Sequence, residues 1–125
     1  MKKLLLALPF VAVLTACGGS IESDVEELAH NYCEAVKRMD WRNAEPLAKP
    51  FVLQNREGMH EQNRQKYAQV FMNQNCNVTK LEGNETAWSV YFGNSKLDSV
   101  EIEWDKRKEQ FFVVSDAFKA DLQLY

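Results

Sequence analysis

The sequence predicts an α+β fold in which N-terminal helices pack against a four-stranded antiparallel sheet. Apolar residues recur at helical spacing up to about residue 73 and at every second position after residue 75. Turn signals at Gly83-Asn84 and Gly93-Asn94 separate the later segments. Helices followed by consecutive strands are typical of this class, because the helices can then cover one face of the sheet.

The first predicted helix covers about 24–39. Ser23 to Glu26 reads as a capping box, in which side chains satisfy the free backbone groups at a helix start. The residues that recur at helical spacing are Val25, Leu28, Ala29, Tyr32, Val36 and Met39. We therefore expect one face of this helix to pack on the core.

A second, short helix is predicted from Trp41 to Ala48, with Asp40 as its cap. Pro46 and Pro50 limit it, because proline lacks a backbone donor.

The segment after Pro50 is less regular. The apolar run 51–53 fits either a helix or a strand, and 55–58 is predicted to be a turn. A third helix is expected over about 60–73. Its apolar stripe comprises Met59, Tyr67, Val70 and Phe71.

Four strands are predicted after residue 75. They cover 76–82, 86–92, 99–105 and 110–115. In the third strand, Val100, Ile102 and Trp104 are expected to face inward. The fourth is apolar on both faces, which predicts a central or covered position. The tail places Phe118, Leu122 and Tyr125 at helical spacing.

Residues 1–16 have the layout of an export signal. Two lysines precede an apolar run of 11 residues, from Leu4 to Leu14. The run is too short to span a bilayer as a helix, which needs about 20 apolar residues. We therefore expect this segment to direct export and to be removed.

Leu14-Thr15-Ala16-Cys17 follows the apolar run directly and resembles the lipobox of bacterial lipoproteins. The resemblance implies that Cys17 receives diacylglycerol, that cleavage occurs before it, and that acyl chains such as palmitate anchor the mature protein in a membrane. Gly18 stands where an aspartate would favour the inner membrane. The resemblance thus implies the outer membrane of a Gram-negative bacterium, facing the periplasm. The alternative is an ordinary secretory signal cut near Ala16.

The predicted organisation is a signal peptide at 1–16, a lipidated cysteine and short tether at 17–22, and a single domain at 23–125. The tether would reach at most about 20 Å. Without Lys2 and Lys3, the 15 basic residues become 13, against 18 acidic residues. This negative balance argues against nucleic-acid binding, because phosphate backbones repel it.

The segments Tyr32-Cys33-Glu34-Ala35 and Met39-Asp40-Trp41-Arg42-Asn43-Ala44, together with the four late strands, resemble the NTF2-like superfamily. The resemblance is to its small lipoprotein branch of DUF4878 type and would cover about 24–115. It implies an NTF2-like or cystatin-like cone between helices and sheet. Enzymes of the superfamily place Asp, His and Tyr in this cone, where Asp40, Tyr32, Tyr67 and Tyr91 are conceivable occupants.

Cys33 and Cys76 are the remaining thiols. An exported compartment is oxidising, so an even pair favours a disulfide between the first helix and the first strand. The alternative is two buried thiols that act as small apolar residues.

No metal or cofactor is expected. His30 and His60 lack partners at metal-ligand spacing, and we interpret them as surface or boundary residues. Tyr32, Tyr67, Trp88 and Trp104 are either core rings or the walls of a pocket. Lys106-Arg107-Lys108 reads as a solvated turn that could meet an anionic partner or a lipid headgroup.

The expected protein is therefore a membrane-anchored envelope lipoprotein with a small domain that binds a protein partner or a small apolar ligand. It is not expected to be an enzyme. The alternative is a hydrolase or isomerase with a buried acid in the cone.

Overall fold

The computed structural model describes residues 17–93 and 95–118. The export signal at 1–16 and most of the predicted helical tail, with Leu122 and Tyr125, lie outside the described residues.

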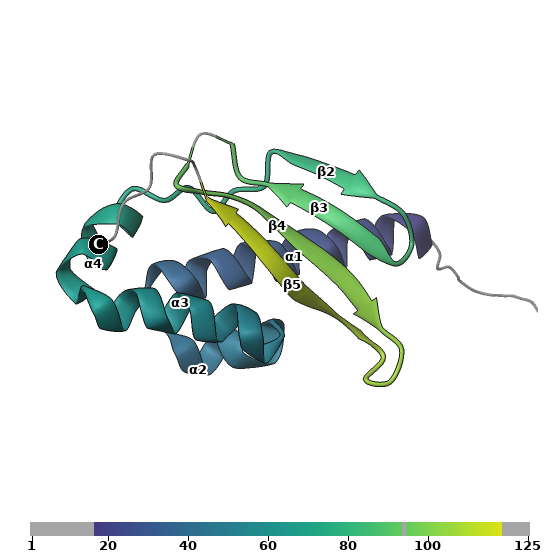
Figure 1. Cartoon of the computed structure of the whole chain (residues 1–125). Helices are drawn as coiled ribbons and strands as arrows, with labels where there is room; N and C mark the ends of the chain where they lie inside the picture. The colour runs from purple at the N-terminus through teal and green to yellow at the C-terminus, as the bar shows by residue number, and fades with distance from the viewer. Residues whose placement is uncertain (1–16, 94, 119–125) are drawn as a thin grey trace, which may run out of the picture.

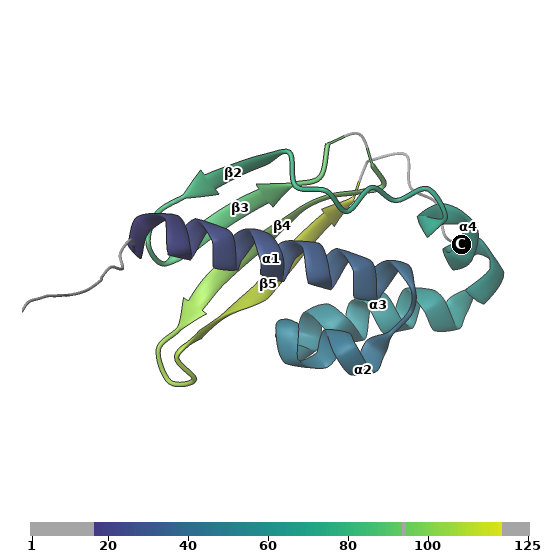
Figure 2. The ribbon, with the colours of Figure 1, turned by 180° about the vertical axis from the view of Figure 1, so that it is seen from behind.

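The described chain forms a helical layer on one face of a four-stranded antiparallel sheet, which confirms the α+β class. The helical elements are α1 (Cys17–Lys37), α2 (Trp41–Ala44), the 3-10 turn η2 (Glu45–Leu47), α3 (Pro50–Gln62) and α4 (Arg64–Phe71). The strands are β2 (Lys80–Gly83), β3 (Ala87–Tyr91), β4 (Leu97–Asp105) and β5 (Gln110–Phe118), in the order β2-β3-β4-β5. In Figure 1, α1 lies behind the sheet. Figure 2 shows the molecule from behind, and there α1 crosses in front of the sheet.

Helix α1 begins six residues earlier than predicted, at Cys17 instead of Ser23. The capping box at Ser23 therefore does not start the helix, because the chain is already helical there. The predicted tether also differs: a helix rises only about 1.5 Å per residue, so 17–23 spans about 9 Å. The helix ends at Lys37, two residues before the predicted limit, and Met39 adopts a φ of 60° in the turn that follows.

Asp40 caps α2 as predicted, since its side chain accepts a hydrogen bond from the Asn43 backbone N–H at 3.3 Å. The predicted turn at 55–58 is wrong, because these residues lie inside α3. Pro50 sits at the start of α3, where its missing N–H costs nothing. Burial of Val52, Leu53 and Arg56 outweighs the local turn signal. Asn63 then caps α4, so the predicted third helix is divided.

The first strand is shorter than predicted, because 76–79 lie outside β2. Strand β5 is the last strand in the sheet order, so of the two predicted positions, central or covered, the central one does not hold. It is nevertheless covered: Ala48 pairs with Val113, and the Lys49 N–H donates to the Val113 carbonyl at 2.9 Å. Phe112 and Val113, which point to opposite faces of β5, are both buried, and the Lys49 side chain lies over the Phe112 ring.

The core lies between α1, α4 and the inner face of the sheet. Its largest fully buried side chains include Tyr32, Tyr67, Phe71, Phe92, Leu97 and Ile102. The buried Gln74 closes one side by bonding both backbone groups of Leu97, at 2.8 and 3.0 Å. This polar link holds the chain between α4 and β2 against the sheet.

Candidate functional site

Cys17, the predicted lipidation site, is the first residue of α1. The start of α1 lies at one end of the molecule, and α4 lies at the other (Figure 1). Within the described part of the chain, no helix has both the length and the apolar character needed to cross a membrane.

A disulfide joins Cys33 of α1 to Cys76, with the two Cα atoms 5.5 Å apart. Of the two alternatives that the sequence left open, the structure has the bonded pair. Because Cys76 precedes β2, the bond ties α1 to the chain before the sheet and not to a strand. His30 packs beside it, with Nδ1 2.8 Å from the Cys76 carbonyl.

His60 lies in α3 and contacts aromatic rings. Its ring centroid is 5.8 Å from that of Trp41 and 5.3 Å from that of Tyr67. Among the residues that the structure describes, no group of three potential ligands could hold a metal ion.

The structure does not bring the four predicted pocket residues together. Tyr32 and Tyr67 are fully buried in the core, and the Tyr67 hydroxyl donates to the Val36 carbonyl at 2.9 Å. Trp88 is buried on β3, and Trp104 stands 39 % exposed on β4. Trp104 lies on the same face of β4 as the buried Ile102, as predicted, but it stands partly exposed because β4 extends here beyond the core.

The other conceivable cone residues also have local roles. Asp40 caps α2, and the exposed Tyr91 hydroxyl donates to Glu82 at 3.2 Å.

A buried polar cluster was missed by sequence reasoning. Asp116 accepts a hydrogen bond from the Tyr32 hydroxyl at 2.8 Å and pairs with Arg56 Nε at 3.2 Å. The Arg56 and Asp116 side chains are only 10 % and 5 % exposed, and Arg56 also stacks over the Phe118 ring. Arg56 could not be foreseen because it lay in the predicted turn.

Burial dominates the protonation equilibria of this cluster. It raises the pKa of the Asp116 carboxyl, although Arg56 and the Tyr32 hydroxyl act in the opposite direction. Burial and the neighbouring Asp116 also raise the pKa of Tyr32, and burial raises that of Tyr67. Both tyrosines therefore remain neutral donors at physiological pH.

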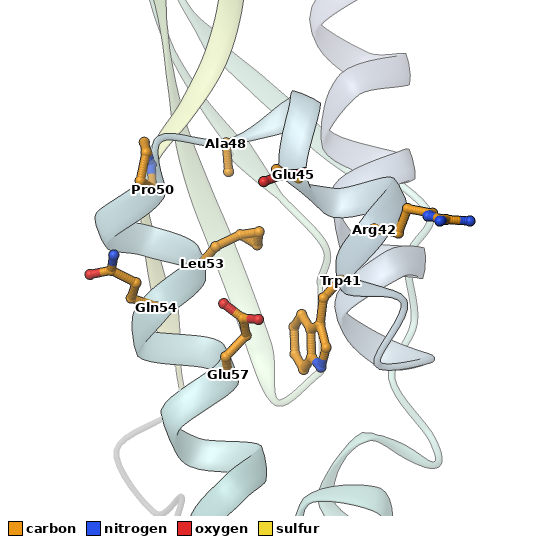
Figure 3. Close-up of a pocket in the computed structure, with 8 residues that line it drawn as sticks. All are labelled: Trp41, Arg42, Glu45, Ala48, Pro50, Leu53, Gln54 and Glu57. Carbon is orange, nitrogen blue, oxygen red and sulfur yellow. The ribbon is translucent and has the colours of Figure 1, made fainter.

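An open cleft of about 350 Å³ lies between the α2–η2 segment and α3. One side of the cleft is a face of α3, formed by residues at spacing i, i+3, i+4 and i+7: Pro50, Leu53, Gln54 and Glu57. From the facing segment it is lined by Trp41, Arg42, Glu45 and Ala48. Figure 3 shows the Trp41 indole, the Leu53 side chain and the Glu57 carboxylate together in the space between the two segments.

The cleft combines an apolar floor with two carboxylates. Leu53 and Ala48 are buried, whereas Glu45 is exposed and Glu57 half-buried. Within the described residues, neither glutamate forms an ion pair. Arg42 extends away from Glu57 (Figure 3). The cleft lining therefore holds two carboxylates and one guanidinium, and it presents a net negative charge beside an aromatic ring.

Trp41 is held in place from behind by other rings. It lies 6.1 Å from Tyr67, and Tyr67 in turn lies 4.5 Å from Phe71. Because Tyr67 and Phe71 are buried, this row of rings fixes Trp41 to the core. Sequence reasoning placed Trp41 at the start of a short helix. It missed Glu57 because α3 was not recognised as one helix, and it missed Glu45 because η2 faces α3 only in the folded chain.

No family model, curated protein or solved structure matches this chain.

Proposed function

We propose that the protein is a lipid-anchored component of the cell envelope that binds a partner protein in the cleft between α2–η2 and α3. The anchor is the acylated Cys17, and the location is the outer membrane facing the periplasm, as the lipobox resemblance implies. The observation that carries the binding role is the pairing of Trp41 with Glu57 in one cleft.

The arrangement of the two ends supports this role. Cys17 begins α1, whereas α2 follows its last turn and the α2–η2 segment packs back against the same helix. The cleft therefore lies beside the later part of α1, away from the end that carries the anchor. A bilayer at the first turn would leave the cleft open to the periplasm.

The lining of the cleft defines the chemistry of the partner. A cation is attracted by the carboxylates and by the indole face, and the apolar floor accepts hydrocarbon. A Lys or Arg side chain provides both a charged head and an aliphatic stem. We therefore expect a partner segment with a basic residue beside an apolar one, in preference to a small apolar ligand, which a more enclosed site would bury.

The alternative function, a hydrolase or isomerase with a buried acid, has one observation in its favour. Asp116 is a buried carboxyl with a raised pKa beside Tyr32. However, this carboxylate already accepts a hydrogen bond from the Tyr32 hydroxyl and pairs with Arg56. Asp116 also does not line the cleft in which a substrate could bind. We therefore favour the binding role.

Site-specific photocrosslinking in intact cells tests the proposal. A photoreactive residue replaces Gln54, which lines the cleft, or Gln65, an exposed residue of α4 that serves as the matched control. We expect a discrete protein adduct from position 54 and not from position 65. The adduct should weaken in the Glu45→Gln/Glu57→Gln variant, whose fold loses no ion pair.

Two outcomes would contradict the proposal. One is the same adducts from both positions. The other is an adduct that persists unchanged in Trp41→Ala, provided that circular dichroism shows this variant to be folded.

A further inference from the structure

The turn between β4 and β5 carries three consecutive cationic residues, Lys106, Arg107 and Lys108. All three are exposed. Within the described residues, none of them forms an ion pair, although Lys108 lies 5.7 Å from the centre of the Phe112 ring. The turn therefore offers a concentrated positive charge on a chain that is otherwise acidic.

Local bonds fix the shape of this turn. The Asp105 carboxylate accepts from the backbone N–H groups of Arg107 and Lys108 at 2.9 and 3.0 Å. Glu109 closes the turn with a φ of 54°, and its N–H donates to the Asp105 carbonyl. The backbone that carries the three cations is thus fixed before binding, so the turn itself does not have to be ordered by a ligand.

The acidic neighbours do not cancel the charge of the turn. Asp105 is paired with Lys49, which reaches it from the start of α3. Glu109 offsets one of the three cations, and Glu103, which lines the same surface pocket as Lys106 and Arg107, offsets a second. Charges elsewhere on the domain that lie beyond about 8 Å are largely screened at physiological salt. A surplus of positive charge remains at the tip.

An exposed tryptophan, packed on a half-buried phenylalanine, lies directly behind the cations. Trp104 is 39 % exposed and meets Phe111 edge-to-face, with ring centroids 5.0 Å apart. Tryptophan beside basic residues suits a membrane–water interface, because the indole ring enters the headgroup region while the cations meet phosphates.

The position of the β4–β5 hairpin in the fold also suits a contact with the membrane. In both views the β4–β5 turn points toward the end of the molecule where α1 begins, and α4 lies at the opposite end (Figure 1, Figure 2). A bilayer at Cys17 would therefore lie on the side toward which this turn extends.

We propose that the β4–β5 hairpin is a second membrane contact, in which Lys106, Arg107 and Lys108 bind anionic lipid headgroups and Trp104 enters the interface. This proposal rests on the membrane anchoring of the proposed function. The contact alone is weak, but attachment at Cys17 holds the hairpin at high effective concentration near the surface. It would orient the domain and turn the α2–α3 cleft away from the bilayer.

Vesicle binding with a chemically supplied anchor tests this contact separately from natural lipidation. In the mature chain Cys17 is the thiol outside the Cys33–Cys76 disulfide, so one tetradecyl-maleimide chain can be attached there. A single acyl chain binds only marginally and reversibly, which leaves added attraction measurable. The probes are phosphatidylcholine vesicles with and without phosphatidylglycerol, with binding measured by co-sedimentation.

We expect phosphatidylglycerol to tighten binding of the acylated protein by roughly tenfold or more. The Lys106→Gln/Arg107→Gln/Lys108→Gln variant should lose most of this gain. A matched variant, Arg38→Gln/Arg64→Gln/Lys66→Gln, removes the same charge from exposed positions at the other end and should retain it. Added salt should abolish the gain.

Equal binding to the two vesicle types would overturn the proposal, and so would an equal loss in the two variants. Because the acyl chain is added chemically, neither result depends on whether the cell lipidates Cys17. Failure of the hairpin contact is thus distinguishable from failure of the anchor.

Discussion

At the scale of single residues, Asp105 links the hairpin to the helices. It pairs with Lys49 at the start of α3 and accepts two backbone bonds within its own turn. The hydrogen bond from Lys49 and those from the turn hold the pKa of Asp105 at about 2, below its ordinary value of 3.8.

This depressed pKa predicts a pH dependence of stability. A carboxyl with a lower pKa in the folded state stabilises the fold fully above its unfolded value and loses this contribution as pH falls through the folded value. For Asp105 the loss occurs between about pH 4 and about pH 2. We expect Asp105→Asn, which keeps the turn geometry, to lose less stability over this interval than the native chain. Urea midpoints at several pH values measure it.

The exposed Asp24 of α1 provides the control, because no partner in the hairpin depends on it. If Asp105→Asn and Asp24→Asn followed the same curve as the native protein, the pairing of Asp105 with Lys49 would not contribute to stability.

Residue-scale features were the hardest to foresee. The capping role of Asp40 was predicted because a cap is a local interaction. The Arg56–Asp116 pair was not, because it joins positions far apart in the sequence and buries two charges. Neither residue type nor spacing signals such a contact. It follows from the packing of α3 against β5.

At the scale of elements, the disulfide and η2 determine how helices meet the sheet. The Cys33–Cys76 bond connects α1 to the chain before β2 across 43 residues. The backbone contacts of Ala48 and Lys49 fix the η2–α3 junction to the edge of β5.

Removing the disulfide should destabilise the fold strongly. In the chain-entropy model, a loop of this length contributes about 4 kcal/mol, because the bond restricts the unfolded chain. We expect Cys33→Ala/Cys76→Ala to lower the free energy of unfolding by about this amount, measured by urea denaturation. Reduction of the native protein should produce a similar loss, whereas Cys17→Ser should not. A double variant as stable as the native chain would contradict this role of the bond.

The order of the elements could be predicted because the change from helical to alternating period is strong. Their limits could not be predicted equally well. The Asn and Gly residues of 55–58 indicated a turn, yet Val52, Leu53 and Arg56 become buried only when α3 continues through it. In the same way, the alternation at 76–79 indicated a strand, but the disulfide at Cys76 holds this segment against α1.

At the scale of the whole molecule, the proposed functions lie at opposite ends. Cys17 and the β4–β5 hairpin lie toward one end, whereas α2 and α3, which flank the cleft with Trp41 and Glu57, lie beside the C-terminal half of α1 (Figure 1). The lipobox resemblance could be found in the sequence because the residues adjoin one another. The cleft could not, since it forms only where α3 packs beside α2 and η2.

The central claim of this account is the acylation of Cys17, and mass spectrometry of the protein extracted from membranes tests it most directly. We predict that the N-terminal peptide begins at Cys17 and carries diacylglycerol with a further acyl chain on its amino group. Cys17→Ser should leave the protein unacylated and should release it from the membrane fraction. An N-terminal peptide with an unmodified Cys17, or one that begins at another residue, would contradict the account.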